Sequence, residues 1–183
     1  MTQIITLTTD FGPDSPYVGQ MKGVLLSRNP AATIVDITHS IPPQDIARGA
    51  LALDDAARWF PANTIHVAVV DPGVGTERRL VYARIGEQHF LAPDNGLLGL
   101  VARRAQPDRI VTLTESRFWQ PEVSATFHGR DILAPVAAHL SLGVEPGEFG
   151  PIKTRSCRST GRWSGTLPTN APAVSWQSTR SAT

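Results

Sequence analysis

The chain has 183 residues, 41% of them hydrophobic, and a single cysteine. This length and apolar content suit one domain with its own core, and one cysteine excludes an intrachain disulfide or a cysteine-only zinc site. The formal charge of +1, with 18% charged residues, argues against a disordered chain or a basic nucleic-acid-binding protein. Without a leader-like start or an apolar run near the ~20 residues of a transmembrane helix, we expect a soluble cytoplasmic protein with no membrane partner.

Apolar runs alternate between strand-like and helix-like patterns along most of the chain. In order, the sequence predicts a strand over 4–9, a helix over 18–28, a strand over 33–38, a helix over 46–60, strands over 64–70, 80–85 and 89–92, a helix over 96–105, a strand over 109–114 and a helix over 131–142. Near-continuously apolar strands joined by helices are typical of a parallel sheet covered on both faces. The sequence therefore predicts an α/β fold with a mostly parallel sheet and helices on both faces.

The charge of the chain is unevenly distributed. Residues 151–183 hold five of the 17 basic residues and none of the 16 acidic ones, and they are rich in Ser, Thr, Arg, Pro and Gly without periodicity. We expect an α/β domain over 1–150, followed by an irregular and poorly ordered tail over 151–183.

Polar residues gather directly after the predicted strands. They are Asp10, Asp36, His39, Asp71, Arg78, Arg79, Asp94 and Asn95. The carboxyl ends of strands in an open α/β sheet share one rim, where such residues can converge on a ligand. Asp and Asn also suit turns and caps, so each residue alone has a structural explanation, but several such loops on one rim favour a site.

Two segments are especially dense in chemistry. In 71–79, Pro72 fixes a turn, and Gly73 and Gly75 permit positive φ or close backbone approach to a ligand, with Asp71 at the strand end. No Gly-Lys-Ser/Thr follows and the third dinucleotide glycine is missing, which argues against a nucleotide-phosphate loop. In 126–131, His128 precedes a glycine at a helix entrance, where backbone N–H groups favour developing negative charge.

Six ordered segments together resemble a known family. They are TTDFG (8–12), YVGQMKG (17–23), DITH (36–39), VVDPGVG (69–75), PDNG (93–96) and TFHGRD (126–131). Over roughly residues 4–150 the chain resembles the S-adenosyl-L-methionine (SAM) hydroxide adenosyltransferases, relatives of fluorinase and chlorinase. The resemblance implies a fluorinase-like N-terminal α/β domain and a homotrimer. It further implies attack of water or hydroxide on C5′ of SAM, which yields adenosine and L-methionine with no cofactor or metal.

The resemblance also implies roles for particular residues. It carries a water-activating set onto Asp71, Arg78 and His128, and substrate binding onto Asp10, Asn95, Thr126 and Gly129. Asp10 matches the residue that holds the ribose hydroxyls, and Gly129 lacks the serine hydroxyl that fluorinase presents to fluoride. Which residue takes the proton from water stays open: His128 can orient water or accept its proton, Asp71 can accept a hydrogen bond, and Arg78 can stabilise hydroxide.

Two departures from the family pattern keep alternatives open. Members of the family usually have an acidic residue near the position of Ser15, and here the carboxylate lies one position earlier, at Asp14. In addition, 151–183 does not resemble the β-rich C-terminal domain of the family, which supplies adenine and methionine contacts across a trimer interface. A frame-shifted or truncated gene product would account for this. One alternative is thus an impaired family member that only binds adenosine-like ligands or oligomerises.

Two further alternatives concern the chemistry. A metal-dependent hydrolase could draw on Asp10, Asp36, His39, Asp71 and His128. Arg78 beside a dication would be unfavourable, and no His-Glu-x-x-His-like spacing supports such a site. A SAM-dependent halogenase is disfavoured because halide-using relatives replace the Asp-Arg-His set that this chain retains.

Overall fold

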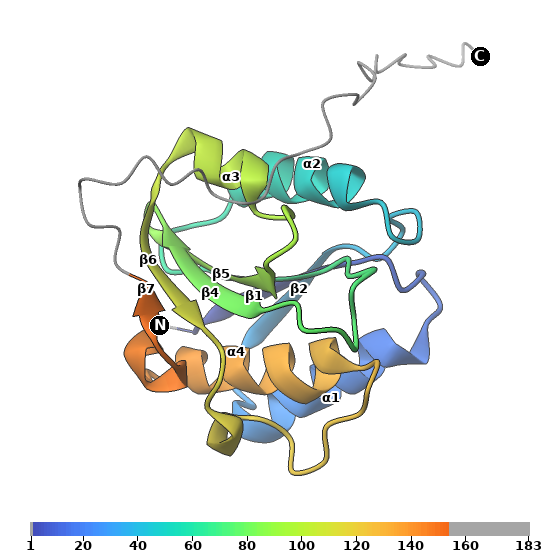
Figure 1. The fold of residues 1–183 in the computed structure, drawn as a ribbon, viewed down its shortest axis with the longest axis vertical. Helices are drawn as coiled ribbons and strands as arrows, with labels where there is room; N and C mark the ends of the chain where they lie inside the picture. The colour runs from blue at the N-terminus through green and yellow to red at the C-terminus, as the bar shows by residue number, and fades with distance from the viewer. Residues whose placement is uncertain (1, 154–183) are drawn as a thin grey trace.

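One mixed sheet lies between two pairs of helices in the computed structural model, which describes residues 2–153 (Figure 1). The strands are β1 (Ile4–Thr9), β2 (Thr33–Thr38), β3 (Ile65–Val69), β4 (Leu80–Ile85), β5 (Gln88–Pro93), β6 (Pro107–Thr112) and β7 (Ile152–Lys153). The helices are α1 (Pro16–Arg28), α2 (Ile46–Ala57), α3 (Gly99–Arg104) and α4 (Ala134–Ser141), with short 3-10 turns η1 (Ser116–Phe118) and η3 (Pro146–Phe149) and a π-helical turn η2 (Gly129–Leu133).

The sheet has the strand order β2-β1-β3-β5-β4-β6-β7. The four strands β2, β1, β3 and β5 pair in parallel, whereas β4 is antiparallel to both of its neighbours and β7 is antiparallel to β6. Strands β1, β2, β3, β5 and β6 therefore run in one direction, which confirms the predicted mostly parallel sheet. The exception arises from the tight hairpin between β4 and β5, where Gly86 has a φ of 59°.

Helices cover both faces of the sheet, as predicted. Helices α1 and α4 pack on one face, and α2 and α3 pack on the other (Figure 1). Strand β3 shows why its sequence is almost entirely apolar, with His66 as its one polar residue: Val67 and Val69 belong to the core under α1 and α4, whereas Ala68 belongs to the core under α2. Successive side chains of a strand point to opposite faces, so a strand covered on both sides is buried at every position and favours apolar residues. The buried His66 has a polar partner, because its Nδ1 lies 2.8 Å from Oγ1 of Thr6.

The structure corrects several predicted boundaries. Helix α2 ends at Ala57 rather than at residue 60, and α3 begins at Gly99 because Gly96 adopts a φ of 102° in the preceding turn. Strand β6 spans 107–112 rather than 109–114, because Pro107 pairs with β4 across a register shift. The predicted 131–142 helix begins two residues earlier, as the π-helical turn η2.

Two residues of the predicted irregular tail belong to the sheet. Ile152 and Lys153 pair with Val111 and Ile110 as strand β7, so the sheet uses two residues that the composition assigned to the tail. The rest of the predicted tail, 154–183, lies outside the described residues. Within residues 2–153, no helix is both long and apolar enough to cross a membrane.

Candidate active site

The segment that follows β3 brings Arg78 back toward the end of that strand. Gly75 has a φ of 81°, and a Cβ there would lie 3.1 Å from the carbonyl oxygen of Ala125 in a second loop. A Cβ on Gly73 would lie 3.3 Å from Cγ of Arg78 and 3.6 Å from Oδ1 of Asp71. The two glycines therefore permit close approaches within the protein itself, besides any approach to a ligand.

Asp71, Arg78 and His128 form one hydrogen-bonded chain. Arg78 Nε donates to Asp71 Oδ2 at 2.6 Å, and Arg78 Nη2 lies 2.7 Å from Nδ1 of His128. The side chains of Asp71 and Arg78 are only 6% and 12% exposed. Charge-assisted hydrogen bonds shielded from water hold their geometry strongly. The structure thus brings together three residues that the sequence placed in two separate loops.

The pKa of His128 is lowered in this hydrogen-bonded chain, which favours the neutral imidazole. Burial lowers the pKa of His128 below its usual value, and the charge of Arg78 lowers it further, although Ser124, Asp71 and Asp131 act in the opposite direction. An arginine can only donate hydrogen bonds, so Nδ1 of His128 accepts from Arg78. The neutral ring therefore carries its proton on Nε2, which makes that atom a donor.

The second oxygen of Asp71 differs from the first. Oδ1 is buried and receives no hydrogen bond from any residue in 2–153, whereas Oδ2 is bound by Arg78. A buried acceptor without a partner costs about 1–3 kcal/mol, so such atoms mark sites where a ligand or water is expected.

A small cavity of about 70 Å³ adjoins this chain of residues. Its polar lining consists of Asp10, Asp71, Thr126, His128 and Gly129, and its apolar lining consists of Phe11, Val69, Val74, Leu80 and Leu133. Asp10 enters from the end of β1, where its Oδ2 accepts a hydrogen bond of 2.8 Å from the backbone N–H of Gln44. Three of the four predicted substrate-binding residues therefore line the same cavity as two of the three predicted catalytic residues.

Packing accounts for the glycine at position 129. A Cβ on Gly129 would lie 3.3 Å from Cγ2 of Val69 and 3.4 Å from Sδ of Met21. These contacts place η2 tightly against β3 and α1. The position thus lacks a hydroxyl and also has little room for one.

Asn95 does not line the cavity. Its Nδ2 donates to the carbonyl of Val70 at 2.8 Å, and its Oδ1 accepts from the backbone N–H of Leu97 at 3.2 Å. Asn95 therefore ties the loop after β5 to the residue that precedes Asp71. This is the turn-forming role that its residue type also allowed.

Asp36 and His39 form a separate cluster outside the cavity lining. Oδ1 of Asp36 lies 3.1 Å from Nε2 of His39, Oδ2 accepts from Lys22, and Nδ1 of His39 lies 2.9 Å from Oγ1 of Thr9. In the part of the chain that the structure describes, no group of three or more His, Cys, Asp or Glu side chains is arranged to hold a metal ion.

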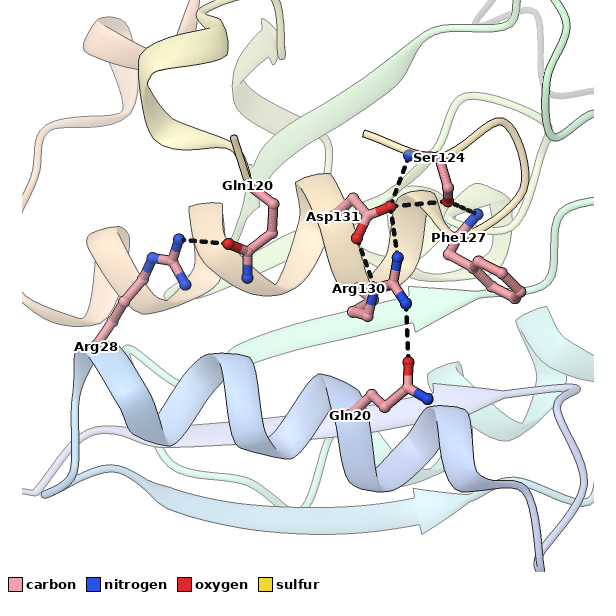
Figure 2. A network of polar contacts seen from close by, with 7 residues as sticks. All are labelled: Gln20, Arg28, Gln120, Ser124, Phe127, Arg130 and Asp131. Atoms are coloured by element: carbon pink, nitrogen blue, oxygen red, sulfur yellow. Dashed lines mark hydrogen bonds and ion pairs between the residues drawn. The ribbon is translucent and has the colours of Figure 1, made fainter. Parts of the chain in front are cut away.

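A buried carboxylate anchors the loop that carries Thr126 and His128 (Figure 2). Asp131 is 1% exposed, and its Oδ2 accepts from the backbone N–H and the hydroxyl of Ser124 at 2.9 and 2.8 Å. Arg130 Nε donates to the other oxygen at 2.6 Å. Burial alone would raise the pKa of Asp131, but the bonds from Arg130 and Ser124 hold it below its usual value.

The residues on either side of this loop form hydrogen bonds with α1 at two points (Figure 2). Arg130 Nη1 donates to Oε1 of Gln20 at 2.9 Å, and Arg28 Nη2 donates to Oε1 of Gln120 at 3.2 Å. Sequence reasoning placed Asp131 only at a helix start and missed this anchoring. The available signal was an acidic residue inside an otherwise apolar helical pattern, which requires partners when it is buried.

Comparison with known proteins identifies the family to which this chain belongs. The profile of the SAM hydroxide adenosyltransferase N-terminal domain matches residues 5–150. The chain belongs to the SAM hydroxide adenosyltransferase family. This finding confirms the resemblance that the six sequence segments indicated.

Relatives and solved structures agree with this membership. An (R)-S-adenosyl-L-methionine hydrolase of Thermus thermophilus is 45% identical over an alignment of 151 residues that covers 78% of this chain and 58% of that protein. A fluorinase of an Actinoplanes species is 31% identical over 170 residues, covering 80% of this chain and 57% of that protein. The crystal structure of an uncharacterized conserved protein from Thermotoga maritima superposes with a TM-score of 0.79 at 38% identity, over 86% of this chain and 62% of that one. The chain therefore spans somewhat more than half the length of these family members.

Proposed function

We propose that this adenosyltransferase-family chain takes part in hydrolysis of SAM to adenosine and L-methionine. The observation that carries the proposal is the Asp71-Arg78-His128 chain beside a cavity that Asp10 and Thr126 also line. In the reaction, the oxygen of water forms a bond to C5′ while the bond from C5′ to sulfur breaks. The bonding pair passes to the sulfonium, which leaves as the thioether of methionine, and one proton of water passes to a base.

Asp71 is the proton acceptor that the geometry favours. Its Oδ1 is free of hydrogen bonds from the described residues, whereas Nδ1 of His128 is already occupied by Arg78. In this proposal Asp71 Oδ1 accepts a hydrogen bond from the attacking water and then its proton. The proton on Nε2 of His128 makes the imidazole a donor, so His128 orients an oxygen instead of taking a proton from it.

Arg78 has an electrostatic role in this proposal. Its guanidinium lies between Asp71 and His128, where it orients both side chains and stabilises an oxygen that gains hydroxide character. A sulfonium is already a good leaving group, so the site must mainly position a desolvated nucleophile in line with C5′ and sulfur. Asp10, Thr126 and Gly129 are proposed to hold the adenosine side of the substrate, and Asn95 to position its own loop.

The other two reactions fit the site less well. A divalent cation between Asp71 and His128 would face the guanidinium of Arg78, which already occupies both partners. A halide nucleophile needs no proton acceptor, yet Asp71 presents one, and Gly129 supplies no hydroxyl to a halide. Water is therefore the nucleophile that this set of groups suits best.

The relatives are longer than this chain, and the part that it does not match is relevant to oligomeric assembly. The family resemblance implies a homotrimer in which a second domain completes the adenine and methionine contacts, and this assembly remains part of the proposal. Light scattering of the purified chain tests it directly: a mass three times 19.7 kDa is expected, and a monomer would contradict it.

The deciding experiment incubates the chain with SAM, with and without chloride, and separates adenosine, 5′-chloro-5′-deoxyadenosine and methionine by chromatography. We expect equimolar adenosine and methionine, insensitive to chloride and to EDTA. Asp71→Asn should slow adenosine formation by about 10²–10⁴-fold, as loss of general-base assistance does. Tight binding of SAM without any product would reject hydrolysis in favour of the binding-only alternative, and a chlorinated product would favour the halogenase.

A further inference from the structure

A second, larger cavity lies on the α4 face of the sheet, lined in part by the segment that follows α4. It has a volume of about 190 Å³, and Tyr82, Arg84, His89, Arg109 and Glu145 contribute its polar lining. None of these residues belongs to the proposed active site. At this volume the cavity has room for more than one water molecule and therefore for a small ion.

Three of the lining side chains form one row across adjacent strands. His89 of β5 is the register partner of Arg84 of β4, which in turn is the partner of Arg109 of β6. Figure 1 shows these three strands side by side. The row shares its sheet face with Tyr82, two residues before Arg84, so all of these side chains point to the α4 side.

Two arginines at directly opposite positions of neighbouring strands repel each other. The protein offers little compensation. Within residues 2–153, Arg84 has no ion pair, and Arg109 has only Glu145, whose carboxylate is 3.8 Å away and 79% exposed. Exposed pairs at this distance contribute little. Arg84 and Arg109 are themselves exposed, so water rather than protein carboxylates solvates most of their charge, and both guanidinium groups are accessible to an anion.

The neighbouring groups suit an anion as well. The Tyr82 hydroxyl lies 2.8 Å from Nδ1 of His89, and burial raises the pKa of Tyr82 to about 12, so the phenol keeps its proton. Burial and the charge of Arg84 lower the pKa of His89 to about 4. When the phenol donates to Nδ1, the neutral ring of His89 carries its proton on Nε2 and offers a donor beside the two guanidinium groups.

We propose that this cavity binds a small, doubly charged oxyanion such as a phosphate group, held between Arg84 and Arg109. Two guanidinium groups match the oxygens of such an anion with charge-assisted, bidentate hydrogen bonds. The site stands independently of the proposed SAM hydrolysis.

Calorimetry with inorganic phosphate tests the proposal on the full chain, with sulfate and acetate as comparison anions at matched ionic strength. We expect saturable binding of phosphate and sulfate, and weaker binding of singly charged acetate. Arg84→Gln and Arg109→Gln should each weaken phosphate binding by about tenfold or more, because a charge-assisted hydrogen bond is lost. The matched control is Arg103→Gln, an exposed arginine on α3 that is remote from the cavity and should bind as the unaltered chain does.

A second measurement follows the ring of His89 by NMR. A bound anion should raise the pKa of His89 because it offsets Arg84 and Arg109; Glu145 and Tyr82 are the other titratable groups that face the cavity. No phosphate binding would overturn the proposal. Equal binding by Arg84→Gln, Arg109→Gln and Arg103→Gln, or an unchanged pKa of His89 at saturation, would also overturn it.

Discussion

The buried carboxylate of Asp131 offers the sharpest test of how the active-site loop is held. Replacement of Asp131 by Asn keeps the shape of the side chain but removes its charge and one acceptor oxygen. In the native protein two donors of Ser124 and two of Arg130 bind the carboxylate, at 2.6–3.1 Å. The variant must leave at least one of these donors facing an amide N–H group.

The expected loss of stability follows from burial. Removal of one partner of a buried ion pair costs about 3–5 kcal/mol. Asp131 is fully buried, but the side chain of Arg130 is 29% exposed and can be hydrated in the variant. We therefore expect a loss of about 2–3 kcal/mol, or a fall in Tm of about 4–12 °C for a domain of this size. Thermal unfolding followed by circular dichroism measures this shift.

The pH dependence of this loss has a defined sign. Because the folded pKa of Asp131 lies below its usual value, ionised Asp131 stabilises the fold at pH values above the usual aspartate pKa of 3.8. That contribution disappears as the pH falls through the lowered folded pKa. The difference in stability between the native chain and Asp131→Asn should therefore be constant near neutrality and shrink below about pH 4.

The same replacement should also slow the reaction. The loop between Ser124 and Asp131 carries Thr126 and His128, and a displacement of about 1 Å at a reacting group can cost about 10²-fold in rate. Asp108→Asn, an exposed aspartate on β6, is the matched control and should change neither Tm nor rate. If Asp131→Asn kept the Tm and the adenosine-forming rate of Asp108→Asn, the anchoring role would be refuted.

Two further substitutions and one pH profile test the candidate active site and the fold around it. Arg78→Lys should reduce adenosine formation by at least about tenfold without unfolding the protein, because one ammonium cannot span both Asp71 and His128 as the guanidinium does; full activity would contradict this. The rate should stay level from pH 8 to below the usual histidine pKa of 6.5 and fall only in more acidic buffer, because the lowered pKa of His128 keeps Nδ1 free to accept from Arg78; an inflection above pH 6.5 would refute it. Gly150→Ala should destabilise the fold by at least about 2 kcal/mol, measured by urea unfolding, because its φ is 149° and a Cβ would lie 2.1 Å from the carbonyl oxygen of Thr112; an unchanged midpoint would show that the β7 edge relaxes freely.

Local signals in the sequence were sufficient for the order of elements up to α4. Alternating apolar runs with clear stops, such as Pro30 after α1 and the Gly86 turn between β4 and β5, set strands and helices by period and by turn chemistry alone. The boundaries that failed depend on pairing. Pro107 and Ile152 enter the sheet because a neighbouring strand offers hydrogen bonds, and neither residue lies in an apolar run that would predict a strand.

For the candidate site as well, the sequence indicates some features and the tertiary structure determines the others. The sequence by itself was enough to predict Asp71, Arg78 and His128 as a water-activating set, because the ordered motifs that carry the family resemblance contain all three. Only the tertiary structure distinguished the two oxygens of Asp71, placed Nδ1 of His128 beside Arg78 and showed that Asn95 donates to the carbonyl of Val70. These properties depend on which atoms meet across segments remote in the chain, and a one-dimensional pattern records residue types but not the partner of each atom.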